Sequence, residues 1–358
     1  MAETSRPSPD PIHPRSTPPW LSRPLRRIIA ISLLILVPWW AYFHWLSHQD
    51  LGDLSGAAGD YIEFFRLMQS SMGGFDPSHL LIPKDEIQFM KSRDEIRAIT
   101  NPRFLKAEAA EYLKPDDLVI GLTYGDDSRA YPLRVLRWRQ CVNDNISGLP
   151  IAVTYGPLTE AVVTFIRQDA DREWEFGVSG LLHQNDVLFF DRRTSDTPTE
   201  SLWSQVGMRA VSGPASGQEL QTIPCVLSTW SVWLAENPQT VVLGEDPDRK
   251  QIFATNPYEE YEATPNPFTP VKFDERFPAK TRVMCLEHKG EKIAWVVDSF
   301  RDLKGLWKDN VGDITITLRY DPDMKTLRLV AAEPDQPRQV YAFWFAWSAL
   351  HPDTKVIP

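Results

Sequence analysis

The hydrophobic pattern of this chain has two parts: one long apolar run near the N-terminus and many short apolar runs after residue 115. The long run, IIAISLLILVPWWAYFHWL, covers 19 residues (28–46) and is interrupted by Ser32, Pro38 and His44. As an α-helix rising about 1.5 Å per residue, it would be about 28 Å long, close to the roughly 30 Å of a bilayer's hydrocarbon core. The pattern therefore predicts one transmembrane helix over residues 25–47.

The charges beside this run predict its orientation. Arg23, Arg26 and Arg27 precede it, whereas Asp50 and Asp53 follow it. By the positive-inside rule, the N-terminus stays in the cytoplasm and the rest of the chain is periplasmic or extracytoplasmic. We therefore expect a single-pass protein of the inner (cytoplasmic) membrane. A cleaved signal peptide is the main alternative, but the lead of 27 residues is long and no A-x-A-like cleavage site follows the run.

The segments on either side of the predicted helix have little pattern of a folded domain. Residues 1–24 contain seven prolines among Ser, Arg and Thr, which predicts a disordered cytoplasmic tail. Residues 48–79 are expected to form a tether and a short amphipathic helix, YIEFFRLMQSSM at 61–72, which ends at Gly73-Gly74.

Short β-like runs separated by turn residues dominate the remaining sequence. The runs 119–125 and 129–136 predict one hairpin, 150–156 and 160–166 predict a second, and 174–178 and 187–191 predict further strands. Residues 228–238, STWSVWLAENP, place apolar residues at helical spacing and stop at Pro238, which predicts a helix.

The same order of features occurs twice. The matched pairs are Val119 and Val283, Leu122 and Leu286, Ala130 and Ala294, Tyr131 and Trp295, Asp144 and Asp309, Asn145 and Asn310, Tyr155 and Tyr320, Trp230 and Trp344, Trp233 and Trp347, Pro238 and Pro352, and Thr240 and Thr354. The offset falls from 165 to 114, so the first copy has about 51 extra residues, between about 169 and 228. Chance similarity of β-rich segments is the alternative.

This pattern predicts a strand-rich α+β fold for residues 80–358. Two pseudo-repeated halves, about 115–243 and 280–357, would each contain hairpins and a Trp-x-x-Trp helix and would share one core. One transmembrane helix would precede this extracytoplasmic domain.

Composition narrows the range of partners. The full chain of 358 residues has a formal charge of −10, and residues 47–358 contain 33 basic and 46 acidic residues, a balance of −13. An exported domain this acidic lacks the excess positive charge that nucleic-acid binding requires. Three cysteines are too few for a disulfide scaffold, so one bridge with a spare thiol or three buried thiols both fit. The apolar neighbours of Cys141, Cys225 and Cys285 favour buried thiols.

Two polar clusters are candidate ligand sites. The first contains Arg137, Arg139, Asn143 and Asp144 around Trp138, and the second, in the extra segment, contains His183, Asn185, Asp186, Asp191, Arg192 and Arg193, with Trp203, Ser204 and Gln205 behind it. The seven candidate ligand residues are Arg137, Arg139, Asn143, Asp144, His183, Asp186 and Asp191. Because guanidinium groups suit carboxylate or phosphate, we expect both clusters to line one cleft for a small polar or anionic ligand. The alternative is that Asn and Asp fix turns and the Arg residues pair with them. No sequence motif indicates a catalytic group, a metal site or a cofactor.

Several segments together resemble a known family. They are RAYPLRVLRWRQCVND (129–144), FGVSGLLHQNDVLFFDRR (176–193), SLWSQ (201–205) and FWFAWSALHPDT (343–354). Over most of residues 80–357 the chain resembles the prokaryotic family known as domain of unknown function 3179. The resemblance implies an exported or membrane-anchored domain whose biochemical activity is not established.

This chain departs from the family at two places. Where the family usually reads T-Y-C-P-L-C and W-H-E, this chain reads T-Y-G-P-L-T (154–159) and W-R-Q (138–140). The family residues would suit a soft metal or thiol redox chemistry, for which Gly156 and Thr159 are not comparable ligands. We therefore interpret Gly156 and Thr159 as a degenerate family site.

Two classes of function fit these observations. The favoured one is a membrane-anchored periplasmic protein without catalysis, either a binding module or an accessory subunit of an integral-membrane complex. Its partners would be the lipid bilayer and that complex, and it would have no cofactor. The alternative is an enzyme or metal-handling protein that uses His183, Asp186 and Asp191 in place of the cysteine pair.

Overall fold

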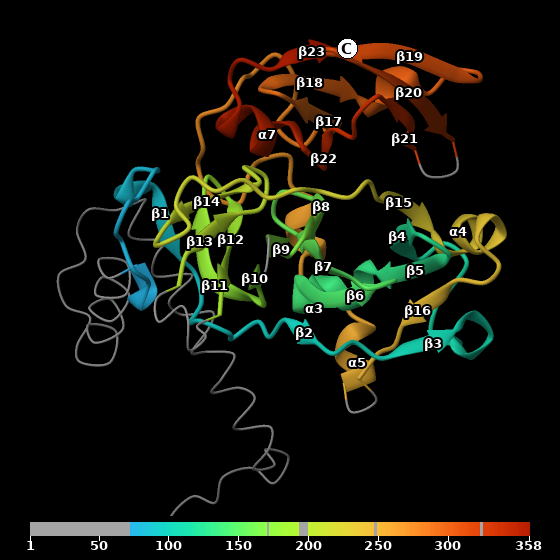
Figure 1. Ribbon diagram of the computed structural model, residues 1–358, viewed down its shortest axis with the longest axis horizontal. Coiled ribbons are helices and arrows are strands. Elements are labelled where there is room, and N and C mark those ends of the chain that lie inside the picture. Colours follow the sequence, from blue (N-terminus) through green and yellow to red (C-terminus); the bar gives the residue numbers. More distant parts are fainter. Residues whose placement is uncertain (1–71, 170–171, 193–199, 247–248, 323–324) are drawn as a thin grey trace, which may run out of the picture. The chain divides into compact units, whose positions relative to one another are not determined.

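The computed structural model describes residues 72–169, 172–192, 200–246, 249–322 and 325–358 (Figure 1). The predicted tail, the transmembrane helix, most of the tether and the amphipathic helix at 61–72, apart from Met72, lie outside these residues. None of the helices within the described ranges is long and apolar enough to cross a bilayer.

Strands dominate the described residues, so the predicted strand-rich α+β fold class is confirmed. The largest sheet has eight strands in the order β2-β6-β7-β8-β22-β17-β18-β23. Their bounds are Ile99–Thr100 (β2), Cys141–Ile146 (β6), Leu149–Gly156 (β7), Ala161–Ile166 (β8), Arg338–Phe343 (β22), Arg282–His288 (β17), Glu291–Val296 (β18) and Lys355–Ile357 (β23).

Two smaller sheets complete the two halves. A five-stranded sheet in the order β15-β4-β5-β16-β3 contains Val226–Thr229, Leu118–Tyr124, Asp127–Pro132, Val241–Leu243 and Phe104–Lys106. A three-stranded sheet contains β19 (Leu306–Val311), β20 (Ile314–Asp321) and β21 (Thr326–Glu333). The helices are α3 (Leu133–Arg139), α4 (Trp230–Glu236), α5 (Lys250–Phe253), α6 (Glu259–Glu262) and α7 (Trp344–Leu350), with short 3-10 turns η1 (Met72–Gly74), η2 (Lys84–Glu86), η3 (Ala107–Ala109) and η5 (Val297–Phe300).

The strand pairings of the first half recur in the second. The hairpin β4–β5 corresponds to β17–β18, and the antiparallel pairing of β15 with β4 corresponds to that of β22 with β17. The final strand of each half, β16 or β23, follows a helix and pairs in parallel with the second hairpin strand. The meander β6–β7–β8 likewise corresponds to β19–β20–β21.

Individual side-chain contacts repeat as well. The indole Nε1 of Trp233 donates to Thr240 Oγ1 at 2.9 Å, and the indole Nε1 of Trp347 donates to Thr354 Oγ1 at 2.9 Å. Both indoles are buried. Each bond joins a helix to the residue directly before the next strand, β16 or β23, so the two tryptophans occupy the same structural position in their halves.

The two halves share an apolar core. One cluster contains Ile120 and Val153 of the first half together with Leu286 and Ile316 of the second. Strands β8 and β22 pair across the boundary and make the eight-stranded sheet continuous.

The extra residues of the first half form a sheet of their own. Strands β11 (Phe176–His183), β12 (Asp186–Asp191), β13 (Leu202–Ser204) and β14 (Arg209–Ser212) lie side by side with β1 (Ile87–Phe89), and β9 (Gln168–Asp169) pairs with β10 (Arg172–Glu173) (Figure 1). The amide of Asn143 on β6 both donates to Phe176 O and accepts from Phe176 N, each at 2.8 Å. These bonds join the inserted sheet to the first half.

One element differs from its prediction. The run 129–136 was expected to form a strand, but the strand ends at Pro132 and α3 begins at Leu133. Leu133 and Leu136 are buried with helical spacing. Proline fixes its own φ and lacks an N–H, so Pro132 suits the residue that precedes the first helical turn.

Candidate functional site

An open cleft lies where the first half meets the inserted sheet. Its volume is about 640 Å³. The lining residues come from the loop after β2, from β6, and from the segments next to β8, β10 and β12: Thr100, Asn101, Pro102, Asn143, Asp144, Asn145, Arg167, Glu173, Trp174, Glu175 and Arg192. A space of this size can hold a small molecule.

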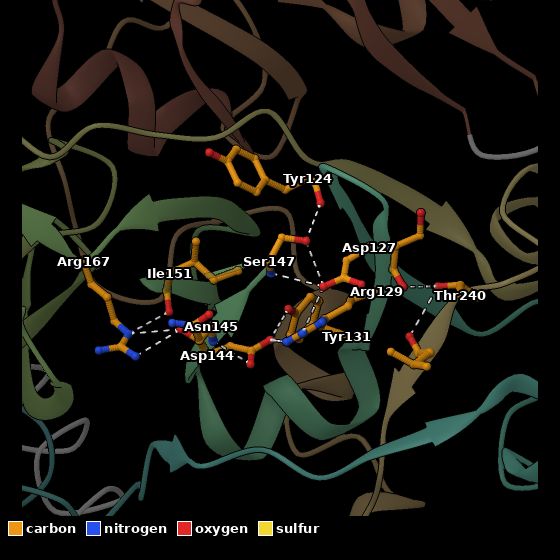
Figure 2. A network of polar contacts seen from close by, with 12 residues as sticks. Tyr124, Asp127, Arg129, Tyr131, Asp144, Asn145, Ser147, Ile151, Arg167 and Thr240 are labelled. Carbon is orange, nitrogen blue, oxygen red and sulfur yellow. Dashed lines mark hydrogen bonds and ion pairs between the residues drawn. The ribbon is translucent and has the colours of Figure 1, made fainter. Parts of the chain in front are cut away.

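A buried carboxylate, that of Asp144, anchors one wall of the cleft (Figure 2). Its Oδ2 accepts from Arg129 Nη1 and from the hydroxyl of Tyr131, both at 2.6 Å. Its Oδ1 accepts from the backbone N–H of Asn145 at 2.7 Å. Burial and the neighbouring carboxylate raise the pKa of Tyr131 well above its ordinary value. Tyr131 therefore remains a neutral hydrogen-bond donor that helps to hold Asp144 in place.

The guanidinium of Arg167 lies against the same wall. Its Nε donates to Ile151 O at 3.1 Å, its Nη2 to Asp144 O at 3.1 Å and its Nη1 to Trp174 O at 2.9 Å. Nη1 also forms an ion pair with Glu173. Three backbone carbonyls thus fix the position of this cation, and they carry no net charge to neutralise it.

The second cation of the cleft, Arg192, is held differently. Its two Nη atoms donate to the two carboxylate oxygens of Asp94, each at 2.8 Å, and its Nε lies 2.8 Å from Glu175 Oε1. The hydrogen bonds with Asp94 are the main reason that the pKa of Arg192 is raised. Arg192 is therefore already neutralised by protein carboxylates.

Trp174 contributes the aromatic part of the lining. The side chain is buried and its ring lies 5.3 Å from that of Trp203 between centroids. Its Nε1 has no hydrogen-bond partner among the described residues. This tryptophan belongs mainly to the core, and its backbone carbonyl and edge contribute to the cleft.

Of the seven predicted ligand residues, Asn143 and Asp144 line the cleft. Arg137 and Arg139 belong to α3: Arg137 Nε lies 3.6 Å from Glu262 Oε1, and Arg139 Nη2 lies 3.8 Å from Asp246 Oδ2. Burial lowers the pKa of Arg139. Neither arginine is among the residues that line this cleft.

The remaining three residues lie at opposite ends of the hairpin β11–β12. His183 and Asp186 are paired next to its turn, whereas Asp191 is opposite Phe176 at the far end. The His183 ring contacts Glu86 at 3.0 Å, and Asp191 accepts from Ser201 N at 2.6 Å. His183, Asp186 and Asp191 are not among the residues that line the cleft. An extended hairpin of this length separates its ends by about 20 Å, so all three could not meet at one point. Of the second cluster, Arg192 does line the cleft, together with Asn143 and Asp144 of the first.

Asp186 is completely buried and bonded to the next strand connection. Its carboxylate accepts from Ser204 Oγ at 2.5 Å and from Val206 N at 3.1 Å. Burial raises the pKa of this carboxyl to about 7. These contacts fix the loop between β13 and β14.

The turn at 154–159, interpreted from the sequence as a degenerate family site, is filled by protein atoms. Gly156 ends β7, and a Cβ added there would collide with Gln205 Oε1 and lie 2.7 Å from Thr159 Oγ1. Gln205 is buried, and its Nε2 donates to Thr154 Oγ1 at 2.9 Å. As this turn is arranged, it has no room for a larger side chain at position 156.

The three cysteines are buried thiols without a disulfide, in agreement with the interpretation favoured by their neighbours. Burial raises the pKa of Cys141 to about 12 and that of Cys225 to about 11, so neither is a thiolate at neutral pH. Within the described ranges, no three His, Cys, Asp or Glu side chains are grouped as metal ligands would be.

Sequence reasoning missed Arg167 and Glu173. Arg167 follows the apolar run 160–166, and Glu173 lies in the polar stretch that comes after it, so both resemble ordinary solvated charges. The available signal was the single arginine directly after the apolar run that ends at Ile166, in the half that has the insertion.

Comparison with known proteins gives one match. The model of the family described as "Protein of unknown function (DUF3179)" matches residues 93–340, a span that contains every residue lining the cleft. No curated protein matches the chain. No solved structure matches it either.

Proposed function

The chain belongs to the DUF3179 family, whose function is unknown, and from that premise we propose that it is a membrane-anchored extracytoplasmic protein that binds a small polar ligand without catalysis. The cleft between the first half and the inserted sheet is the single observation that carries the binding role. Its lining combines fixed cations, exposed carboxylates and side-chain amides, which are groups that orient a polar ligand.

The contacts of the other candidates support binding over catalysis. Asp186 and Asp191 accept hydrogen bonds that hold neighbouring strands, and His183 is bonded to Glu86. Gln205 occupies the turn in which the family's cysteine pair would lie. An enzyme or metal-handling protein based on His183, Asp186 and Asp191 would first have to break these bonds.

We also propose that the two halves arose by internal duplication. The repeated strand pairings and the two Trp–Thr hydrogen bonds support this origin. The inserted sheet belongs to the first half alone, so the cleft that it forms with β6 is a feature added to a symmetric scaffold.

A cleft-blocking variant with a matched control tests the binding role. Asn145 is exposed in the cleft, and Asn310 is its exposed counterpart in the second half, away from the cleft. We expect Asn145→Trp to abolish the thermal stabilisation of the purified full-length chain by any ligand found in a screen of polar metabolites. Asn310→Trp should leave that stabilisation unchanged. Equal losses in both variants would show that the ligand binds elsewhere.

The anchoring role has its own test. A reporter that is active only outside the cytoplasm should work when fused after residue 60 and fail when fused before residue 25. Leu34→Arg should impair membrane integration, because an arginine at the centre of a transmembrane helix raises the apparent free energy of insertion by about 2.5–3.5 kcal/mol. A mature chain that starts near residue 50 would instead indicate a cleaved signal peptide and a soluble periplasmic protein.

An accessory-subunit role predicts a partner. We expect a stoichiometric integral-membrane protein to be recovered with the full-length chain from native membranes after mild detergent extraction. Recovery of the chain alone, as a monomer, would argue against this version of the proposal and leave the ligand-binding version in place.

A further inference from the structure

The charge of Arg167 is fixed in the cleft, but its one carboxylate partner among the described residues is exposed. The Arg167 side chain is 11% exposed and its three backbone acceptors are neutral, whereas the Glu173 side chain is 52% exposed. An arginine cannot lose its proton at physiological pH, so a largely buried one needs a counter-ion. An exposed ion pair contributes little to stability, because water solvates the released carboxylate well. Glu173 can therefore be replaced at small cost.

The donor geometry of Arg167 is suited to a second kind of partner. A guanidinium has five N–H groups. In Arg167, Nε donates to Ile151 O and, at 3.3 Å, also to Asp144 O; one N–H of Nη2 donates to Asp144 O and one of Nη1 to Trp174 O. This leaves one N–H on each terminal nitrogen. Glu173 binds at Nη1, and the second N–H of Nη2 has no acceptor within the described ranges. Two adjacent N–H groups match the two oxygens of one carboxylate.

Arg192 shows the contrasting case in the same cleft. Asp94 already binds it through both oxygens, and Glu175 contacts its Nε. Because two protein carboxylates already neutralise Arg192, an outside anion would gain little by displacing them. Among the described residues that line the cleft, Arg167 is the exchangeable cation, and the exposed side-chain amides of Asn101 and Asn145 remain for the other polar groups of a ligand.

We propose that the ligand of this cleft is a small monocarboxylate with further polar groups, which displaces Glu173 and binds Arg167 through both carboxylate oxygens. This inference rests on the proposed ligand-binding function. Glu173 then acts as an internal competitor that occupies the anion position when no ligand is bound.

Two neighbouring glutamates provide a matched pair of variants. Glu173 and Glu175 are 52% and 47% exposed, both line the cleft, and each pairs with one of its arginines. Replacing either by Gln removes one negative charge from the same region. Any general electrostatic increase in affinity for an anion should therefore be the same in both variants. Only Glu173→Gln removes the competitor from Arg167.

The experiment is calorimetric titration of the purified full-length chain with acetate, glycolate, inorganic phosphate and the neutral polyol glycerol, at constant ionic strength. We expect glycolate to bind most tightly and Glu173→Gln to tighten its binding three- to tenfold. Glu175→Gln should change it less than twofold. Arg167→Lys, which keeps the charge but loses the fork, should weaken it at least tenfold.

The outcomes separate this inference from the function on which it rests. Equal tightening in Glu173→Gln and Glu175→Gln, or preference for phosphate over glycolate, would overturn the carboxylate assignment. Binding of glycerol alone, lost in Asn145→Trp, would leave a ligand-binding cleft but contradict the role of Arg167. Binding of no probe to the wild-type chain or to Glu173→Gln would overturn this inference, while the wider metabolite screen still decides the function. Because both glutamates are exposed, misfolding of the Arg167 variant would not affect these comparisons.

Discussion

Removing the carboxylate of Asp144 should destabilise the fold far more than removing its counterpart in the second half. Asp144→Ala removes the 2.6 Å partner of the Arg129 guanidinium, whose side chain is 16% exposed, and leaves it only the half-exposed carboxylate of Asp127, 3.6 Å from its Nη2. It also leaves the buried Tyr131 hydroxyl without an acceptor. Losing a hydrogen bond to a charged group costs about 1.5–3 kcal/mol and an unsatisfied buried hydroxyl about 1–3 kcal/mol, so we expect a loss of about 3–5 kcal/mol of unfolding free energy. Asp309 instead accepts from the neutral Trp295 Nε1 at 3.3 Å, so Asp309→Ala should cost about 1 kcal/mol.

The assay is urea unfolding of the full-length chain, followed by tryptophan fluorescence at neutral pH. The two variants remove the same group at matched positions, so the difference between their unfolding free energies, about 2–4 kcal/mol, reports the lost close partner of Arg129 and the unsatisfied Tyr131 hydroxyl. Adding Arg129→Met to Asp144→Ala should recover part of the loss, because the cation that has lost its closest carboxylate is then gone. Equal costs for the two single variants would refute this reasoning and would mean that the charge of Arg129 is satisfied without Asp144.

Three further results are expected. Trp233→Phe and Trp347→Phe each delete one indole–threonine hydrogen bond, so their costs in chemical unfolding should agree within about 1 kcal/mol; a larger gap would contradict equivalent positions. Gly156→Ala should cost about 1–3 kcal/mol through collision with Gln205, and Gln205→Ala in the same chain should recover part of that loss. Burial raises the folded-state pKa of Asp186 from 3.8 to about 7, so the folded state keeps a proton that the unfolded chain releases. The stability from this group is full below the unfolded pKa and is lost as the pH rises through about 7. Asp186→Asn should therefore flatten the dependence of the unfolding free energy on pH between 3.8 and about 7. An unchanged dependence would show that Asp186 does not titrate in this range.

Features of the fold that depend on neighbouring residues in the sequence could be predicted. Alternation of apolar and polar residues predicted the hairpins, since a strand that buries one face repeats every two residues. The Trp-x-x-Trp spacing and the following proline and threonine predicted equivalent helices, and the structure gives Trp233 and Trp347 the same bond to a threonine. The boundary at Pro132 was missed, because an apolar run of this length fits a strand or a helix until its packing decides.

The candidate site was predictable only in part, for a related reason. Asn143 and Asp144 were identified as members of a polar cluster, and they do line the cleft, from strand β6. Their contacts with Phe176 and Arg129 could not be read from the sequence, because the spacing along the chain does not show which strand faces which. Arg139 and His183 were expected to line one cleft. Arg139 ends α3 beside Asp246, whereas His183 lies in the hairpin β11–β12 beside Glu86, so their surroundings differ.

The sequence by itself determined the strand-rich class, the repeated order of elements, the position of the extra segment and the burial of the cysteines. Each of these follows from local composition and periodicity, which depend only on residues that are close together in the sequence. Only the tertiary structure decided that the extra segment forms its own sheet against β6 and that Arg167 is held by three carbonyls beside an exposed glutamate. The physical reason is that the charge balance of a side chain depends on the atoms around it, and these come from segments far apart in the chain.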